Sequence, residues 1–232
     1  MARENPRWGA ARIVGALRAV GLDVSASTVR AYRQQALRRP PSPSWRTFLR
    51  RHAGEIWASD FFTVQTLTFR TLYVFVIISH QRRQITHWNV TAHPTAAWVW
   101  QQVSEATPCN TAPRFWIRNR DTSDGRDCVA KTARLGIRTV LTPAQAPRAN
   151  AIAERVIGTV RRECLDHLIP LGEAHLRRIL RDYVAFYGAD RPHRSLGLEP
   201  PAGPRPLPSA PGDRIVADPV LGGLQHVYRR VA

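Results

Sequence analysis

The hydrophobic pattern of the chain's middle region changes from a strand type to a helical type. Runs at 55–64, 71–79 and 84–91 are apolar and rich in β-branched or aromatic residues, which predicts three strands joined by short turns. Pro94 then opens a segment with helical character, and we predict a helix over 95–106. Consecutive strands joined by short turns pair as an antiparallel sheet.

After this helix, short apolar runs alternate with amphipathic segments. The pattern predicts a strand at 114–118, a helix near 125–135, a strand at 137–142, and helices at 149–168 and 173–187. Three antiparallel strands followed by helix, strand, helix, strand and helix match a ribonuclease H-like mixed sheet. A doubly wound sheet would need helices between the first strands as well. The predicted fold class is therefore α/β and ribonuclease H-like.

A separate helical pattern occupies the N-terminal residues. Two pieces have the length and hydrophobic spacing of helices, at 11–20 and 27–37. Ser25 or Ser27 can cap the second piece. This is a helix-turn-helix layout, in which Arg30 and Arg33 would face phosphates or base edges of DNA. A basic helical hairpin that serves as a linker or an oligomer contact is the alternative.

Two proline-rich stretches divide the chain, and both have the composition of linkers. The predicted divisions are a helix-turn-helix DNA-binding segment at 1–37, a linker at 38–44, a core at 45–198, a linker at 199–213 and a basic tail at 214–232. The tail alternates enough to form a small hairpin that turns at Gly222 and Gly223, with a disordered tail as the alternative.

The chain is strongly basic. Its formal net charge is +17, from 34 basic and 17 acidic residues, and Lys131 is the only lysine. Arginine offers a planar fork of donors to phosphate oxygens, and counterion release makes such a surface bind nucleic acid. A GC-rich coding genome would explain the choice of arginine over lysine, but not the twofold excess of basic residues. The charge therefore predicts a nucleic-acid partner.

Membrane, secreted and zinc-binding classes find no support in the sequence. The longest nearly uncharged apolar run, 71–79, is about half of what spans a bilayer, and the first residues do not form a signal peptide. We therefore expect an intracellular, cytoplasmic protein without membrane contact. Cys109, Cys128 and Cys164 are odd in number and lack paired spacing, which argues against a disulfide framework or a zinc site.

Two carboxylates and one amide are the candidates for chemistry. Asp60 lies in an apolar strand beside Phe61 and Phe62, where an ionised group is costly unless a cation or several donors compensate it. Glu154 opens a helix behind a loop rich in proline and alanine, although a carboxylate there can simply compensate the helix dipole. Asn119 follows the predicted strand at 114–118. Only the joint spacing of these residues favours a shared site.

The residues in this order resemble the DDE transposases of bacterial insertion sequences, which are integrase-like and belong to the retroviral integrase superfamily. Trp57-Ala-Ser-Asp60 is similar to the family's first-aspartate strand, and Asn150-Ala-x-x-Glu154 to its helix start. Further similar positions are Pro143 and Pro147 of the loop, Arg161, Trp8-Gly9, Tyr187, Arg191-Pro-His193 and Leu196-Gly197. The resemblance covers nearly the whole chain. It implies binding of mobile-element ends, with metal-dependent strand cleavage and strand transfer.

The chain departs from the family at the second aspartate, where it has Asn119. Between Asn119 and Glu154 lie 34 residues (120–153), close to the family's spacing, whereas Asp121 leaves 32 (122–153). An asparagine offers one neutral carbonyl oxygen and cannot bridge two ions through equivalent oxygens. Either Asp121 substitutes after a loop shift, or the site is impaired.

The resemblance implies Mg²⁺ or Mn²⁺ as cofactor, held by Asp60 and Glu154 with Asn119 or Asp121 as third ligand. It implies double-stranded DNA, both element ends and target, as partner of a homo-oligomer. We expect the phosphates beside the scissile bond to meet four arginines, namely Arg148, Arg155, Arg161 and Arg162. Two alternatives remain at this point: a catalytically inactive DNA-binding remnant, which Asn119 favours, and a ribonuclease that acts on RNA–DNA hybrids.

Overall fold

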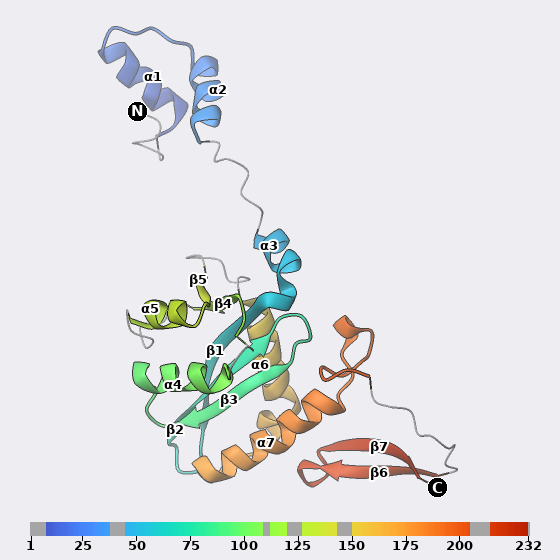
Figure 1. Ribbon diagram of the computed structural model, residues 1–232. Helices are drawn as coiled ribbons and strands as arrows, with labels where there is room; N and C mark the ends of the chain where they lie inside the picture. Colours follow the sequence, from blue (N-terminus) through green and yellow to red (C-terminus); the bar gives the residue numbers. More distant parts are fainter. Residues whose placement is uncertain are drawn as a thin grey trace. The chain divides into compact units, whose positions relative to one another are not determined.

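The computed structural model describes residues 8–37, 45–108, 112–119, 127–142, 150–204 and 214–231. The chain divides into an N-terminal unit, Met1–Phe48, and a core unit, Leu49–Ala232 (Figure 1). Each unit has its own internal packing, so each is described by itself.

The N-terminal unit is built on two helices, α1 (Ala10–Ala19) and α2 (Ala26–Leu37). Ile13 of α1 and Val29 of α2 are buried, which gives the pair a small apolar contact. The hydroxyl oxygen of Ser25 accepts a hydrogen bond from the backbone N–H of Thr28 at 3.2 Å, so the predicted serine cap is confirmed at Ser25. Helix α3 (Trp45–Arg51) spans the division between the units.

A five-stranded mixed sheet forms the centre of the core unit. Its order is β3-β2-β1-β4-β5, in which β1, β2 and β3 pair antiparallel and β1, β4 and β5 pair parallel. The strands are β1 (Ile56–Gln65), β2 (Thr71–Ser79), β3 (Ile85–Thr91), β4 (Phe115–Arg118) and β5 (Arg138–Leu141). The predicted ribonuclease H-like α/β class is confirmed, because the strand directions and the helices between later strands follow that layout.

Helices cover both faces of this sheet (Figure 1). The α-helices are α4 (Ala96–Ala106), α5 (Asp127–Arg134), α6 (Ala151–Glu163) and α7 (Glu173–Ala189). Short 3-10 turns are η1 (Ala53–Glu55), η3 (Leu165–His167), η4 (Arg194–Leu196) and η5 (Leu221–Gly223). Val99 and Val103 of α4 and Cys128 of α5 pack with Phe75 and Trp116 of the sheet in one buried cluster. Helix α6 contacts β1 and β2, and α7 contacts β3.

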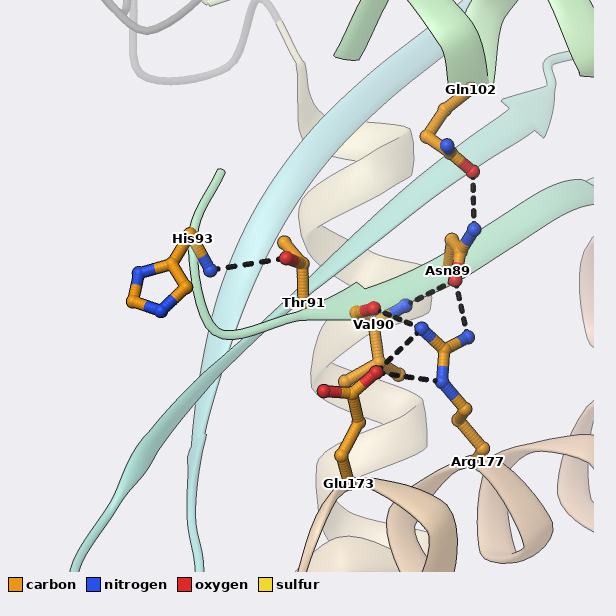
Figure 2. Close-up of polar contacts among 7 residues, drawn as sticks. All are labelled: Asn89, Val90, Thr91, His93, Gln102, Glu173 and Arg177. Carbon is orange, nitrogen blue, oxygen red and sulfur yellow. Dashed lines mark hydrogen bonds and ion pairs between the residues drawn. The ribbon is translucent and has the colours of Figure 1, made fainter. Parts of the chain in front are cut away.

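Asn89, on the edge strand β3, links two of these helices (Figure 2). Its amide nitrogen donates to Oε1 of Gln102 on α4, and its Oδ1 accepts from the guanidinium of Arg177 on α7. Arg177 also donates to the carbonyl oxygen of Val90 and pairs with Glu173 at 2.8 Å. Since Gln102 is buried, its amide needs such partners. The network therefore fixes α4 and α7 to one strand at the free edge of the sheet.

The start of the second proline-rich stretch contacts the core through Arg82. Arg82 donates to the carbonyl oxygens of Pro200 at 2.9 Å and Pro201 at 3.0 Å, and it pairs with Glu199 at 3.3 Å. This arginine therefore holds the first residues of the predicted linker, 199–213, on the core. Composition alone misses the contact, since Arg82 lies far away in the sequence. Residues 205–213 lie outside the described part.

The C-terminal residues form an antiparallel hairpin of β6 (Arg214–Val220) and β7 (Gln225–Val231). Gly222 stands in the turn with a φ of 67°, a left-handed conformation that favours glycine. The side-chain amide of Gln225 donates to the carbonyl oxygen of Glu163 at 3.1 Å, which ties the hairpin to the end of α6. Of the two tail conformations considered from sequence, the structure has the hairpin.

Cys128 and Cys164 are buried, and Cys109 lies outside the described residues. Burial raises the pKa of the Cys164 thiol to about 12. Among the residues that the structure describes, no helix is both long and apolar enough to cross a bilayer.

Loss of the Asn89 network should destabilise the core. In an Asn89→Ala variant the buried amide of Gln102 and the guanidinium of Arg177 each lose a partner, so we expect the free energy of unfolding to fall by about 1–3 kcal/mol in urea titrations. Gln101→Ala changes an exposed amide on the same helix α4 and serves as the control. Equal effects of the two substitutions would contradict the role given to Asn89.

His80 should make stability depend on pH. It is 3% exposed, and burial, followed by the charge of Arg83, lowers its pKa from 6.5 to about 4. Between those pH values the unfolded chain binds the extra proton, so stability falls as the pH drops through 6.5 toward 4. From pH 7.5 to pH 5.0 we expect a loss of about 2 kcal/mol from this residue, measured by chemical unfolding.

His80→Leu should remove that share of the pH dependence, because neither ring nitrogen has a hydrogen-bond partner among the described residues. His226→Leu, at an exposed position of the hairpin, is the matched control and should keep the full dependence. His193, whose pKa is also lowered to about 4, contributes in the same direction in both variants. An unchanged pH profile for His80→Leu would contradict this account.

Candidate functional site

Asp60 occupies the middle of β1 and faces the α6 side of the sheet. Successive side chains of a strand point to opposite faces. Phe61 packs on the cluster under α4, whereas Phe62 lies below the guanidinium of Arg161 from α6, at 5.4 Å from the ring centre. Asp60 therefore shares the face of Phe62. Its Oδ1 accepts a hydrogen bond of 2.9 Å from the backbone N–H of Phe61, and the residue is half-buried.

The register of the parallel strands brings Asn119 to Asp60. Ala58 pairs with Ile117, so the residues two positions further along the two chains come side by side. The amide nitrogen of Asn119 donates to Oδ1 of Asp60 at 3.1 Å. An ionised carboxylate only accepts hydrogen bonds, which fixes the amide with its nitrogen toward Asp60.

Thr142 supports Asn119 from the next strand. Arg118 pairs with Leu141, so Thr142 follows β5 at the level where Asn119 follows β4. The Thr142 hydroxyl donates to Oδ1 of Asn119 at 3.4 Å, and the Thr142 backbone N–H donates to the carbonyl oxygen of Arg118 at 3.0 Å. Both residues stand at the carboxyl ends of parallel strands, where open α/β sheets place ligand sites.

Glu154 reaches the same cleft from the first turn of α6. The cleft has a volume of about 780 Å³, and both Asp60 and Glu154 line it. Asn150, which is buried, donates its amide N–H to the carbonyl oxygen of Ser59 at 3.1 Å, so the start of α6 is fixed beside Asp60. The indole N–H of Trp116 donates to the Ser59 hydroxyl at 2.9 Å and holds β1 to β4 at this point.

An arginine and several aromatic residues also line the cleft. Phe61, Phe62, Tyr73 and Arg161 all line it. Arg161 donates to the carbonyl oxygen of Thr63 at 2.9 Å, so its guanidinium is held against β1 while it spans the ring of Phe62. A cation fixed beside two carboxylates gives the cleft both an anion-binding group and cation-binding groups.

The other predicted site residues do not all meet here. Arg162 is exposed on α6, and Arg155 lines a different pocket rather than the cleft. Arg30 is exposed on α2 in the N-terminal unit, and Arg33 belongs to the same helix. Arg148 and Asp121 lie outside the described residues, so substitution of Asn119 by Asp121 stays a prediction.

The donor set fits a divalent cation only in part. Asp60 and Glu154 offer the charged oxygen ligands that Mg²⁺ and Mn²⁺ prefer. Asn119 presents an N–H to Asp60, and an N–H cannot bind a cation. Its Oδ1 would have to turn inward, which Thr142 allows because a hydroxyl can accept as well as donate. Within the described ranges, no group of three His, Cys, Asp or Glu side chains could hold a metal ion.

Supporting residues were absent from the sequence prediction. Thr142 has no motif of its own, and Ser59 stands in the Trp57-Ala-Ser-Asp60 motif without a predicted role; the roles of both depend on the strand register. Asn150 had a signal, because it stands in the Asn-Ala-x-x-Glu motif, but its bond to β1 did not follow from that motif.

Comparisons with known proteins bear on the fold and on part of the sequence. Residues 135–201 match the family model described as "Integrase core domain". Over 151 residues the chain is 27% identical to the 39.2 kDa protein of insertion element IS476 from Xanthomonas euvesicatoria, a match that covers 64% of this chain and 43% of that protein. The chain thus spans less than half the length of this relative.

Solved structures share the fold at low sequence identity. The catalytic domain of Mos1 mariner transposase aligns with a TM-score of 0.52 and 11% identity, over 61% of this chain and 77% of that one. The HTLV-2 integrase catalytic core domain in complex with magnesium aligns with a TM-score of 0.50 and 10% identity, over 62% and 92%. The chain therefore has the ribonuclease H-like fold of integrase and transposase catalytic cores, and part of it matches the integrase core domain.

Proposed function

We propose that this chain is the core of an insertion-element transposase or integrase whose strand-cleavage and strand-transfer chemistry is impaired by Asn119. The observation that carries the proposal is the meeting of Asp60 and Glu154 in one cleft, with Asn119 bonded to Asp60. Neither carboxylate would be informative alone. Their convergence in one cleft, with Asn119 bonded to Asp60, supports a shared chemical role.

Asp60 and Glu154 would be the ligands of Mg²⁺ or Mn²⁺. Such ions, when bound, stabilise the attacking and leaving oxygens of a phosphodiester. Asn119 can offer a metal ion at most one neutral oxygen. In its present orientation it instead donates an N–H to the Asp60 carboxylate. The charge of Asp60 is thereby stabilised without a cation, which lowers the gain from binding one. The impairment follows from this loss of charge and of an ion-facing oxygen.

Double-stranded DNA is the proposed substrate, both as element end and as target, bound by a homo-oligomer. Arg161 in the cleft and Arg162 beside it would contact phosphates near the scissile bond, together with Arg148. The net charge of +17 supports a polyanionic partner. We further propose that Arg30 and Arg33 of α2 add a second DNA contact from the N-terminal unit.

A catalytically inactive DNA-binding protein is the second candidate. It would occupy element ends or join mixed oligomers without cutting. The hydrogen bond from Asn119 to Asp60 favours it, because a complete acidic triad would place a carboxylate, which cannot donate, at that position.

Asn119→Asp separates these candidates. Restoring the carboxylate should raise the affinity for Mn²⁺ in calorimetry by roughly 10- to 100-fold or more, since even changes outside the ligand set alter metal affinity by that much. Strand transfer on duplexes that carry the element's end sequence should rise in the same variant. Gln101→Glu, an amide-to-acid change at an exposed site on α4, is the control and should change neither quantity.

The pattern of activity then assigns the function. Transfer by both the wild type and Asn119→Asp supports an impaired enzyme, whereas transfer by the variant alone supports the inactive DNA-binding protein. Adding Asp60→Asn to the active variant should abolish transfer. If Asn119→Asp neither binds Mn²⁺ more tightly nor transfers strands, the assignment of this cleft is wrong.

Affinity for duplex DNA should depend steeply on salt. A surface that neutralises several phosphates loses roughly 10³- to 10⁵-fold in affinity between about 50 and 200 mM salt when six to ten contacts are made. Fluorescence anisotropy with labelled duplexes measures this slope. An affinity that stays constant over the same range would contradict DNA binding through the arginine-rich surface.

A further inference from the structure

Helix α6 lines two separate pockets with two different faces. The cleft uses Glu154, Ile157, Gly158 and Arg161. A second pocket, of about 400 Å³, uses Ile152, Arg155, Val156 and Thr159. Each set has the spacing of one helix face, and the sets are offset by two residues, which puts them on nearly opposite flanks. The second pocket is therefore a distinct site on the far side of α6 from Asp60.

The second pocket gathers arginines from three parts of the chain. Arg83 follows β2, Arg155 comes from α6, and Arg191 and Arg194 follow α7. Arg191 is neutralised by Glu163, which it contacts through two nitrogens. Among the described residues, no carboxylate lies within ion-pair distance of Arg83, Arg155 or Arg194. Three positive charges in one pocket thus have no carboxylate partner in the part of the chain that is described.

This excess charge is held in place by the fold. Burial, followed by repulsion from Arg155, lowers the pKa of Arg83 below its usual value. The backbone of Arg83 has a φ of 59°, a left-handed conformation, and its carbonyl oxygen accepts a hydrogen bond of 3.0 Å from the Tyr187 hydroxyl. An anion between Arg83 and Arg155 would attract both guanidinium groups and so offset their mutual repulsion.

His193 supplies an independent indication that the second pocket accepts a polar ligand. It is 8% exposed and lines the pocket, and its Nε2 is buried without a hydrogen-bond partner in the described part of the chain. A buried polar atom left unsatisfied costs free energy that a bound polar group can recover. The ring is fixed edge-on to Tyr187, with 4.7 Å between ring centroids.

The outer face of α6 connects the two pockets with further positive charge. A Cβ at Gly158 would lie 3.0 Å from a guanidinium nitrogen of Arg162. Because glycine has no side chain, the Arg162 guanidinium has space to lie across the helix at this point. Arg155 and Arg162 are both exposed. A DNA strand that leaves the cleft over this face would pass Arg162 and Arg155 on its way to the second pocket.

We propose that the second pocket binds a backbone phosphate of duplex DNA outside the cleft, with Arg83, Arg155 and Arg194 donating to its oxygens. Guanidinium groups suit this ligand, because their planar donors match two phosphate oxygens at once. That the phosphate belongs to DNA rests on the proposed function, whereas the anion-binding chemistry of the pocket does not. Inorganic phosphate can bind the pocket by the same chemistry. Unlike a DNA strand, it cannot contact the pocket and the cleft at the same time.

The test compares two double variants of equal charge. The pocket variant, Arg155→Gln with Arg194→Gln, removes two positive charges from the second pocket. The α7 variant, Arg178→Gln with Arg181→Gln, removes two from exposed positions of α7 that do not line the pocket. The pocket variant should bind duplex DNA roughly five- to tenfold more weakly at about 0.1 M salt, with a salt slope lower by about 1, as for the loss of one phosphate contact. The α7 variant should stay within about twofold of the wild type.

A second readout uses inorganic phosphate as the probe and the imidazole of His193 as the reporter. Phosphate should shift the His193 ring resonances in the NMR spectrum of the wild type and not in that of the pocket variant. Equal losses of DNA affinity in both double variants, or a His193 signal that ignores phosphate, would overturn the proposal.

Failure of this site and failure of the proposed function give different results. If Arg161→Gln in the cleft weakens DNA binding while the pocket variant does not, the cleft stands and the second site is wrong. If the wild type binds no duplex DNA, both the proposed function and the DNA assignment of the pocket are wrong. The phosphate titration then decides whether the pocket binds anions at all.

Discussion

The hydrogen bond from the Asn119 amide to the Asp60 carboxylate is the constraint on which the site depends. Asp60 stands on a strand whose neighbours are aromatic, so its charge must be compensated. An acidic neighbour at position 119 would add a second charge and make a cation necessary. The amide instead supplies a donor, and the carboxylate is stabilised by the protein itself. Under the proposed function, this hydrogen bond reduces the need of the cleft for a metal ion.

Strand register explains why three distant segments meet. Parallel pairing of β1 with β4 and of β4 with β5 sets Asp60, Asn119 and Thr142 at one level of the sheet. The bond from Asn150 to β1 then brings the first turn of α6, and with it Glu154, over that level. The same helix turns its other flank to the arginine pocket. One helix therefore orients both proposed phosphate contacts, and sites built on helices are positioned more precisely than sites on loops.

The sequence alone predicted much of this arrangement. Apolar runs rich in β-branched and aromatic residues located β1, β2 and β3, and the joint spacing of Asp60, Asn119 and Glu154 identified the residues that the structure brings together. It did not predict the partners of Asn119 or the contacts of Arg82, because these hydrogen bonds join residues far apart in the chain and depend on register. Arg155 was expected beside the cleft, yet it lines the second pocket. It follows Glu154 directly in the sequence, but adjacent residues of a helix point in different directions. Composition does not show this difference.

The most direct measurement of the central claim is anomalous diffraction from crystals of the wild type and of Asn119→Asp, each soaked in Mn²⁺ at the same millimolar concentration. The account predicts a strong peak between Asp60 and Glu154 in the variant. In the wild type it predicts a weak peak or none, with the amide of Asn119 still bonded to Asp60. A fully occupied Mn²⁺ in the wild type, with Oδ1 of Asn119 among its ligands, would contradict it.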